Sequence, residues 1–262
     1  MTLNWTYTDK LIYKKNNTNK TKKTIIKTIR DKFSPKYHCP ICGFFGIFLV
    51  YSTETGHRKY AQCPQCMALE RHRLQYCVIK KILQGRNTEE MRILHFAPEK
   101  CLGNIFKNMF KDYLTADLKR SDVDKKEDLT KLSFSDESFD IIFASCVMPY
   151  IKNDNLAFSE IRRVLKPEGF AILFVPIIGD KTIEYPQPNP HEDNHIRCTG
   201  YDYFQRYKPY FSKITVYSSS DFDKKYQLYV NQNRMKFSKK DMPLRPAIRG
   251  KKYLEFVPVC YK

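Results

Sequence analysis

The sequence has 262 residues, a formal net charge of +18, 42% hydrophobic residues and 14% aromatic residues. This length accommodates one full-sized α/β domain with a small additional module and excludes two large domains, while the apolar content excludes a globally disordered chain. The longest apolar runs are of strand length, well short of the roughly 20 residues of a membrane span, and the first residues lack the apolar core of a signal peptide. We therefore expect a cytoplasmic protein without a membrane-spanning helix.

The positive charge is concentrated in two segments, residues 1–36 and residues 223–252. Each segment carries 10 Lys and Arg against 2 Asp and Glu, so together they hold +16 of the net charge. Such a segment either contacts nucleic acid or another anion, or forms a solvated basic surface. Because RNA-modifying enzymes usually need a basic stripe beside the active site, basic residues confined to the two ends disfavour RNA as the substrate.

Changes of pattern divide the chain into four parts. They are a basic N-terminal segment (1–36), a cysteine-rich module (37–68), a connecting helix (69–90) and a larger domain (91–262). A helix is also expected over 22–33 within the basic segment.

The cysteine-rich module contains two Cys-x-x-Cys pairs separated by 20 residues. This spacing is typical of two turns that present four thiolates to one tetrahedral Zn²⁺. Four thiolates leave no open coordination position, so we expect a structural zinc that stabilises a module with little core of its own. A redox pair or unliganded thiols are the alternatives. The predicted ligands are Cys39, Cys42, Cys63 and Cys66.

The rest of the chain alternates helix and strand patterns, which predicts an α/β domain with a mostly parallel sheet. The helical spacing of Leu69, Leu74 and Val78 predicts the connecting helix over about 67–83. Strands are predicted over 92–97, 112–118, 138–147, 170–177, 213–220 and 252–261, and helices over 101–110, 153–165 and 201–211. The third strand of the parallel series has only a weak signal.

Residues 129–176, "LTKLSFSDESFDIIFASCVMPYIKNDNLAFSEIRRVLKPEGFAILFVP", resemble the central part of class I S-adenosylmethionine-dependent methyltransferases. A subgroup of that family is similar over most of residues 39–211, through the motifs "CPQCMALERHR", "LHFAPE" and "HIRCTGYDY". The resemblance implies a Rossmann-like fold with a mostly parallel seven-stranded sheet, a small N-terminal zinc ribbon, and S-adenosylmethionine as cofactor.

Cofactor-binding residues are expected just after the strands, because ligands of open parallel sheets bind beyond the carboxyl ends at the switch point. The resemblance implies that Asp117 accepts hydrogen bonds from the ribose hydroxyls, and that Asp128 and Leu129 read the adenine edge. The first loop departs from the family, since "ILHFAPEKCLG" lacks the usual acid and Gly-rich turn. The candidate cofactor-binding residues are His95, Phe96, Ala97, Pro98, Glu99, Asp117, Leu118, Asp128, Leu129, Ser145 and Cys146.

Methyl transfer needs alignment of acceptor, methyl carbon and sulfur, and a base only where the acceptor must lose a proton. The catalytic candidates are Tyr150, His191 and His195, and a histidine can accept a proton near neutral pH. The candidate substrate-binding residues are Arg197, Arg71 and Arg73. For His195 and for these arginines the alternative is a bracing role. Arg71 and Arg73 diverge on a helix, which favours different partners for them.

Three functions are consistent with these patterns. The leading hypothesis is a methyltransferase acting on an O or N atom of a small-molecule or glycan acceptor, with a structural zinc. The second is a methyltransferase of a ribosomal RNA base whose zinc ribbon binds RNA, and the third is a non-catalytic zinc-ribbon binding protein. We also expect the zinc module to lie at the carboxyl ends of the strands, facing residues 189–197 across the acceptor pocket.

Overall fold

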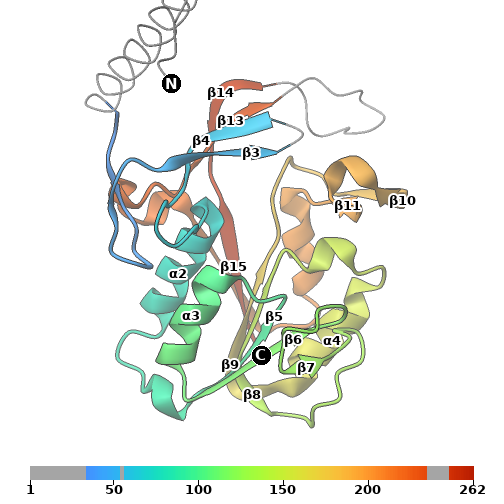
Figure 1. Cartoon of the computed structure of the whole chain (residues 1–262). Coiled ribbons are helices and arrows are strands. Elements are labelled where there is room, and N and C mark those ends of the chain that lie inside the picture. Colours follow the sequence, from blue (N-terminus) through green and yellow to red (C-terminus); the bar gives the residue numbers. More distant parts are fainter. Residues whose placement is uncertain (1–33, 54–55, 235–247) are drawn as a thin grey trace, which may run out of the picture.

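The computed structural model describes residues 34–53, 56–234 and 248–262 (Figure 1). The helix expected over 22–33, and most of the basic N-terminal segment, lie outside these residues. None of the helices within the described residues is long and apolar enough to cross a membrane.

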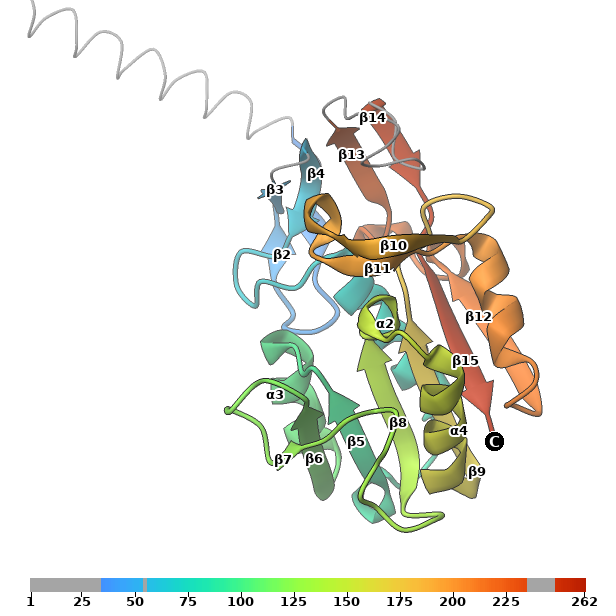
Figure 2. The same ribbon diagram turned by 90° about the vertical axis from the view of Figure 1, so that its right-hand side faces the viewer.

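A seven-stranded sheet forms the centre of the larger domain (Figures 1 and 2). Neighbouring strands among β9, β8, β5, β6 and β7 run parallel, whereas β15 runs antiparallel to both β9 and β12. This arrangement confirms the predicted fold class. The strands, in sheet order, are β12 (Lys213–Ser218), β15 (Phe256–Tyr261), β9 (Leu165–Phe174), β8 (Phe139–Ser145), β5 (Arg92–Phe96), β6 (Asp112–Asp117) and β7 (Lys125–Lys126).

Helices cover both faces of this sheet, which explains why its central strands are apolar on both sides. Helices α2 (Glu70–Ile82) and α3 (Lys100–Met109) lie on one face, and α4 (Asp154–Val164) lies on the other (Figure 1). Successive residues of a strand point to opposite faces. Accordingly, Ile93 of β5 packs in the core with α2 and α3, and Leu94 packs in the core with α4.

Two C-terminal predictions differ from the structure. The helix expected over 201–211 is a 3₁₀ helix, η4 (Tyr201–Tyr207), whose buried Tyr203 and Tyr207 hydroxyls donate hydrogen bonds to the Asp154 carboxylate and the Leu173 carbonyl. The strand expected over 252–261 is divided into β14 (Ile248–Tyr253) and β15. The division occurs at Glu255, whose N–H donates to the Ser219 hydroxyl while the chain passes from one sheet to the other.

The cysteine-rich module is completed by a distant part of the chain. Strands β3 (Leu49–Thr53) and β4 (Gly56–Gln62) follow the short pair β1 (Tyr37–His38) and β2 (Phe45–Gly46). They form a four-stranded antiparallel sheet, in the order β14-β13-β4-β3, with β14 and with β13 (Val230–Arg234). We call this the ribbon sheet. The hairpin of β13 and β14, which we call the C-terminal hairpin, therefore joins the cysteine-rich module and not the central sheet.

The buried guanidinium of Arg73 connects three segments of the chain. It is fully buried on α2, and its Nη1 donates to the carbonyls of Ala61 (2.9 Å) and Ala68 (2.7 Å) in the cysteine-rich module. Its Nε and Nη2 donate to the carbonyls of Tyr226 and Gln227, just before β13. The ribbon sheet, α2 and the C-terminal segment are thus fixed relative to one another.

The ribbon sheet and a second hairpin lie at the same end of the central sheet. This hairpin consists of β10 (Ile183–Asn189) and β11 (His195–Cys198). Both features lie beyond the carboxyl ends of β5 and β8 (Figures 1 and 2).

We predict that Arg73→Lys lowers the free energy of unfolding by about 3 kcal/mol, because an ammonium cannot reach all four carbonyls and leaves buried acceptors unpaired. Urea denaturation measures this change. The matched control is Arg162→Lys, since exposed Arg162 donates only to the carbonyl of Tyr210, and we expect its effect to stay within about 0.5 kcal/mol. Equal stabilities of the two variants would contradict the bracing role of Arg73.

Candidate functional site

The topological switch point lies between β5 and β8. The chain proceeds from β5 to β6 on one side and returns to β8 on the other side, so a crevice for a ligand is expected where these strands end. Two residues at these ends, Ala97 after β5 and Cys146 after β8, have positive φ angles of 47° and 58°. Non-glycine residues in this region are uncommon and tend to cluster at functional sites.

Asp117, at the carboxyl end of β6, is held in a defined orientation. Its Oδ1 accepts hydrogen bonds from the backbone N–H groups of Lys119 (2.8 Å) and Arg120 (2.9 Å). The Arg120 guanidinium in turn donates to the carbonyl of Pro98 (2.8 Å), which ties the loop after β6 to the loop after β5. The side chain of Leu118, which follows Asp117 directly, is 59% exposed.

Asp128 and Leu129 lie in a turn beside the end of β6. The N–H of Glu127 donates to the carbonyl of Asp117 (3.3 Å), and Asp128 Oδ1 accepts from the backbone and the hydroxyl of Thr130. Asp128 is exposed, whereas the side chain of Leu129 is buried. The structure therefore brings this pair to the same edge as Asp117.

The first-loop residues divide into core residues and surface-facing residues. His95 and Phe96 are buried, and the His95 ring packs edge-on against Phe143. His95 Nε2–H donates to Glu99 Oε2 (3.1 Å), and its Nδ1 accepts from the Tyr113 hydroxyl (3.0 Å), since an ionised carboxylate only accepts. The side chains of His95 and Phe96 therefore lie in the core, beneath the loop. His95 affects the candidate site through its hydrogen bond to Glu99.

Glu99 is an ionised carboxylate at the switch point. Burial raises its pKa, but the hydrogen bonds with His95 and with Ser145 outweigh burial and lower the pKa to about 2. The Ser145 hydroxyl also accepts from Gln75 Nε2 on α2 (3.0 Å). A polar cluster from α2, β5 and β8 therefore surrounds the crevice.

The structure brings two of the three catalytic candidates together. Tyr150, on η2 (Met148–Tyr150), is 49% exposed, and its ring centroid lies 4.6 Å from that of His195 in β11. Burial, with Asp193 and Cys146 nearby, raises the pKa of Tyr150, so its hydroxyl is protonated near neutral pH. His191 is exposed and belongs to the turn η3 (Pro190–Glu192).

The bracing alternative is favoured for two of the three arginines. Buried Arg197 pairs with Glu184 (3.0 Å) and donates to the carbonyls of Met148 and Ile151, so it supports the turn that carries Tyr150. Arg73 braces the ribbon sheet, as described above. Arg71 differs from both, because its buried Nε makes no hydrogen bond with any residue in the described part of the chain.

The four predicted zinc ligands form one cluster. Their Sγ atoms all lie within 4.8 Å of one another, and both the Cys39–Cys66 and the Cys42–Cys63 sulfur distances are 3.6 Å. Four thiolates around Zn²⁺ at about 2.3 Å would be about 3.8 Å apart, so the cluster fits this ion.

The two cysteine turns have the same backbone geometry. The Cys39 carbonyl accepts from the N–H of Gly43, and the Cys63 carbonyl accepts from the N–H of Met67. Gly43 and Met67 both have positive φ angles, of 76° and 61°. These turns border a cavity of about 530 Å³ that also touches Glu99 and the first turns of α3, so the cysteine cluster lies next to the switch point.

Two further polar residues of α2, His72 and Gln75, are not among the predicted site residues. Burial is the main cause that lowers the pKa of His72 to about 3, so this ring is neutral and its Nδ1 accepts from the N–H of Leu69 (3.1 Å). Gln75 lies four residues after Arg71, on the same helix face. The spacing of four residues between Arg71 and Gln75 is the sequence signal that could have identified Gln75 as a site residue.

Residues 84–173 match the family model of a methyltransferase domain. The match confirms the predicted enzyme class, an S-adenosylmethionine-dependent methyltransferase. The chain contains a methyltransferase domain. A search of curated proteins gives no match.

Three solved structures illustrate the similarity of fold. The PH0226 protein of Pyrococcus horikoshii is 17% identical, with 73% of this chain and 89% of that chain covered and a TM-score of 0.44. A SAM-dependent methyltransferase of Archaeoglobus fulgidus is 10% identical, with 71% and 93% covered and a TM-score of 0.43. Phosphoethanolamine N-methyltransferase 2 of Haemonchus contortus, solved with S-adenosyl-L-methionine, is 15% identical, with 71% and 51% covered and a TM-score of 0.47.

Proposed function

We propose that this methyltransferase transfers a methyl group to an O or N atom of a small-molecule or glycan acceptor in the cytoplasm. The observation that carries the proposal is the pair of Tyr150 and His195, which stands beside the switch point on elements that follow β8 and β9. An aromatic ring and an imidazole in contact suit an acceptor that must be positioned and must lose a proton.

The cofactor would lie across the carboxyl ends of β5 and β6. Asp117 would bind the ribose hydroxyls, and Asp128 with the backbone of Leu129 would bind the adenine. Bound S-adenosylmethionine supplies a methyl group activated by a positively charged sulfur. His195 accepts the proton of the acceptor hydroxyl or amine, and Tyr150 positions the acceptor.

Zn²⁺ would be structural in this proposal. The four cysteines complete its coordination, and the turns that carry them support α2 through Arg73. The metal would therefore stabilise one wall of the site without taking part in the chemical step.

We predict one Zn²⁺ per chain, measured by elemental analysis of the purified protein. Cys63→Ser should lose the metal and much of its soluble yield, because binding energy of a structural zinc is folding energy. Cys77→Ser, a buried cysteine of α2 outside the cluster, is the control and should keep the metal. Full zinc occupancy in Cys63→Ser, or none in the native protein, would reject this site.

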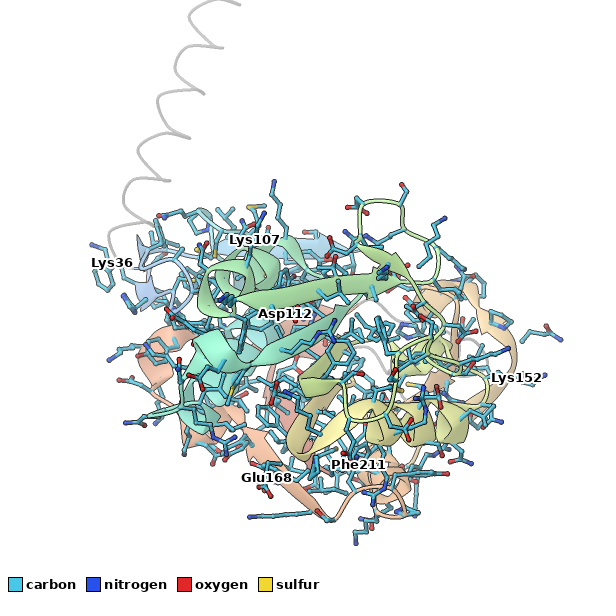
Figure 3. All side chains as sticks on the ribbon, turned by 90° about the horizontal axis from the view of Figure 1, so that it is seen from below. Lys36, Lys107, Asp112, Lys152, Glu168 and Phe211 are labelled. Carbon is cyan, nitrogen blue, oxygen red and sulfur yellow. The ribbon has the colours of Figure 1, made fainter. Side chains whose placement is uncertain are left out.

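We predict that Asp117→Ala weakens binding of S-adenosylhomocysteine roughly 10- to 150-fold, as expected for the loss of charge-assisted hydrogen bonds. Calorimetry measures the affinity. The control is Asp112→Ala at the opposite end of β6, on the side seen in Figure 3, where exposed Asp112 pairs with Arg92. Unchanged affinity in a folded Asp117→Ala protein would remove this residue from the site.

One observation favours RNA as a second candidate acceptor. The ribbon sheet contains no acidic residue in its four strands, and it brings part of the basic segment 223–252 beside the switch point. Directly opposite residues in a sheet share a face, so exposed His57, Lys59 and Lys252 lie on the same face. The basic ends are therefore no longer an argument against RNA.

RNA binding measured as a function of salt tests this second candidate. Replacing Lys59 and Lys252 by Ala should reduce the slope of log K against log salt by about 1.4, as two lost contacts with a single strand predict. The matched control replaces exposed Lys107, at the other end of the domain (Figure 3), and exposed Lys213, the first residue of β12. If the native protein does not bind RNA at physiological salt, this candidate is excluded and the small-molecule or glycan acceptor stands.

A further inference from the structure

Arg71 lies on the face of α2 that meets the carboxyl ends of the central strands. Gln75, one helical turn later on the same face, donates to Ser145 at the end of β8. Besides burial, Cys146 and Glu99 act electrostatically on Arg71, and they follow β8 and β5 respectively. Arg71 therefore lies near the switch point.

One donor of this guanidinium has no partner in the protein. The Arg71 Nε is buried without a hydrogen-bond partner among the described residues. A buried donor without a partner is costly, and guanidinium groups pair well with carboxylates in a bidentate geometry. An anionic group of a ligand would satisfy Arg71.

Glu99 provides the opposite charge beside Arg71. It precedes the first residue of α3, and its carboxylate is hydrogen-bonded to His95 and Ser145, with His72 Nε2 3.7 Å away. The ionised carboxylate is complementary to an ammonium group. The loop after β5 has neither an acid at its start nor a Gly-rich turn. Glu99 is the acid that this loop contributes.

We propose that Arg71 and Glu99 form a charged clamp for the amino-acid end of the cofactor, with Arg71 on its carboxylate and Glu99 on its ammonium group. This inference rests on the proposed binding of S-adenosylmethionine at the switch point. It assigns Arg71 to the cofactor, whereas the sequence analysis assigned it to the acceptor.

The clamp is connected to the cysteine cluster through the first turn of α2. The carbonyl of Ala68, two residues after Cys66, accepts from Arg73, and the N–H of Leu69 donates to His72. In the chain, Arg71 lies between these two backbone groups and the two side chains that bond to them. The second cysteine turn therefore fixes the position from which Arg71 reaches the switch point.

The test compares two ligands that differ only in the amino-acid end. S-adenosylhomocysteine carries the carboxylate and the ammonium group, whereas 5′-methylthioadenosine has the same adenosine and thioether with a methyl group in their place. Calorimetry on the zinc-loaded full chain gives both affinities. We expect Arg71→Met and Glu99→Gln each to weaken S-adenosylhomocysteine roughly 10- to 150-fold and to change methylthioadenosine less than about twofold.

The control is Lys80→Met, which removes an exposed positive charge from the same helix and should change neither affinity. Arg71→Lys, which keeps the charge, should weaken S-adenosylhomocysteine less than Arg71→Met does. Equal losses for both ligands, or no loss for either, would overturn the clamp. A native protein that binds neither ligand would overturn the proposed function and the clamp with it.

Discussion

The buried guanidinium of Arg73 is the interaction on which the arrangement of this protein depends. Four backbone carbonyls, two from the cysteine-rich module and two from the segment before β13, converge on one side chain of α2. Separating these segments would leave a buried charge without its hydrogen-bond partners, which is costly, so the four carbonyls hold the segments together. The ribbon sheet then has one position relative to the central sheet, beyond the carboxyl ends of its strands.

This constraint links the cysteine cluster to the chemistry without placing a metal in the reaction. Helix α2 carries Arg73 on one side and Arg71, His72 and Gln75 toward the switch point. The same helix is thus both the support of the ribbon sheet and a wall of the proposed cofactor site. On the other side of the crevice, buried Arg197 supports the turn of Tyr150 in a similar way.

Local patterns predicted much of the fold and one part of the site. The apolar runs of β5, β8 and β9 and the amphipathic helix α4 are visible in the sequence, and so are the four clustered cysteines. The pairing of β13 with β4 was missed, because both strands are polar and join residues far apart in the chain. Sequence spacing showed that Arg71 and Arg73 diverge. Only the tertiary contacts show which of the two side chains donates its hydrogen bonds to backbone carbonyls.

Hydrogen exchange with and without Zn²⁺ tests most directly whether the cysteine cluster, α2 and the C-terminal hairpin form one unit. After chelation, we expect faster exchange of amides in the first turn of α2 and in residues 224–234, distant in sequence from the cysteines, while β8 and β9 remain protected. Faster exchange confined to residues 39–68, with α2 and β13 unchanged, would contradict the role of Arg73 as the connection between the metal site and the proposed active site.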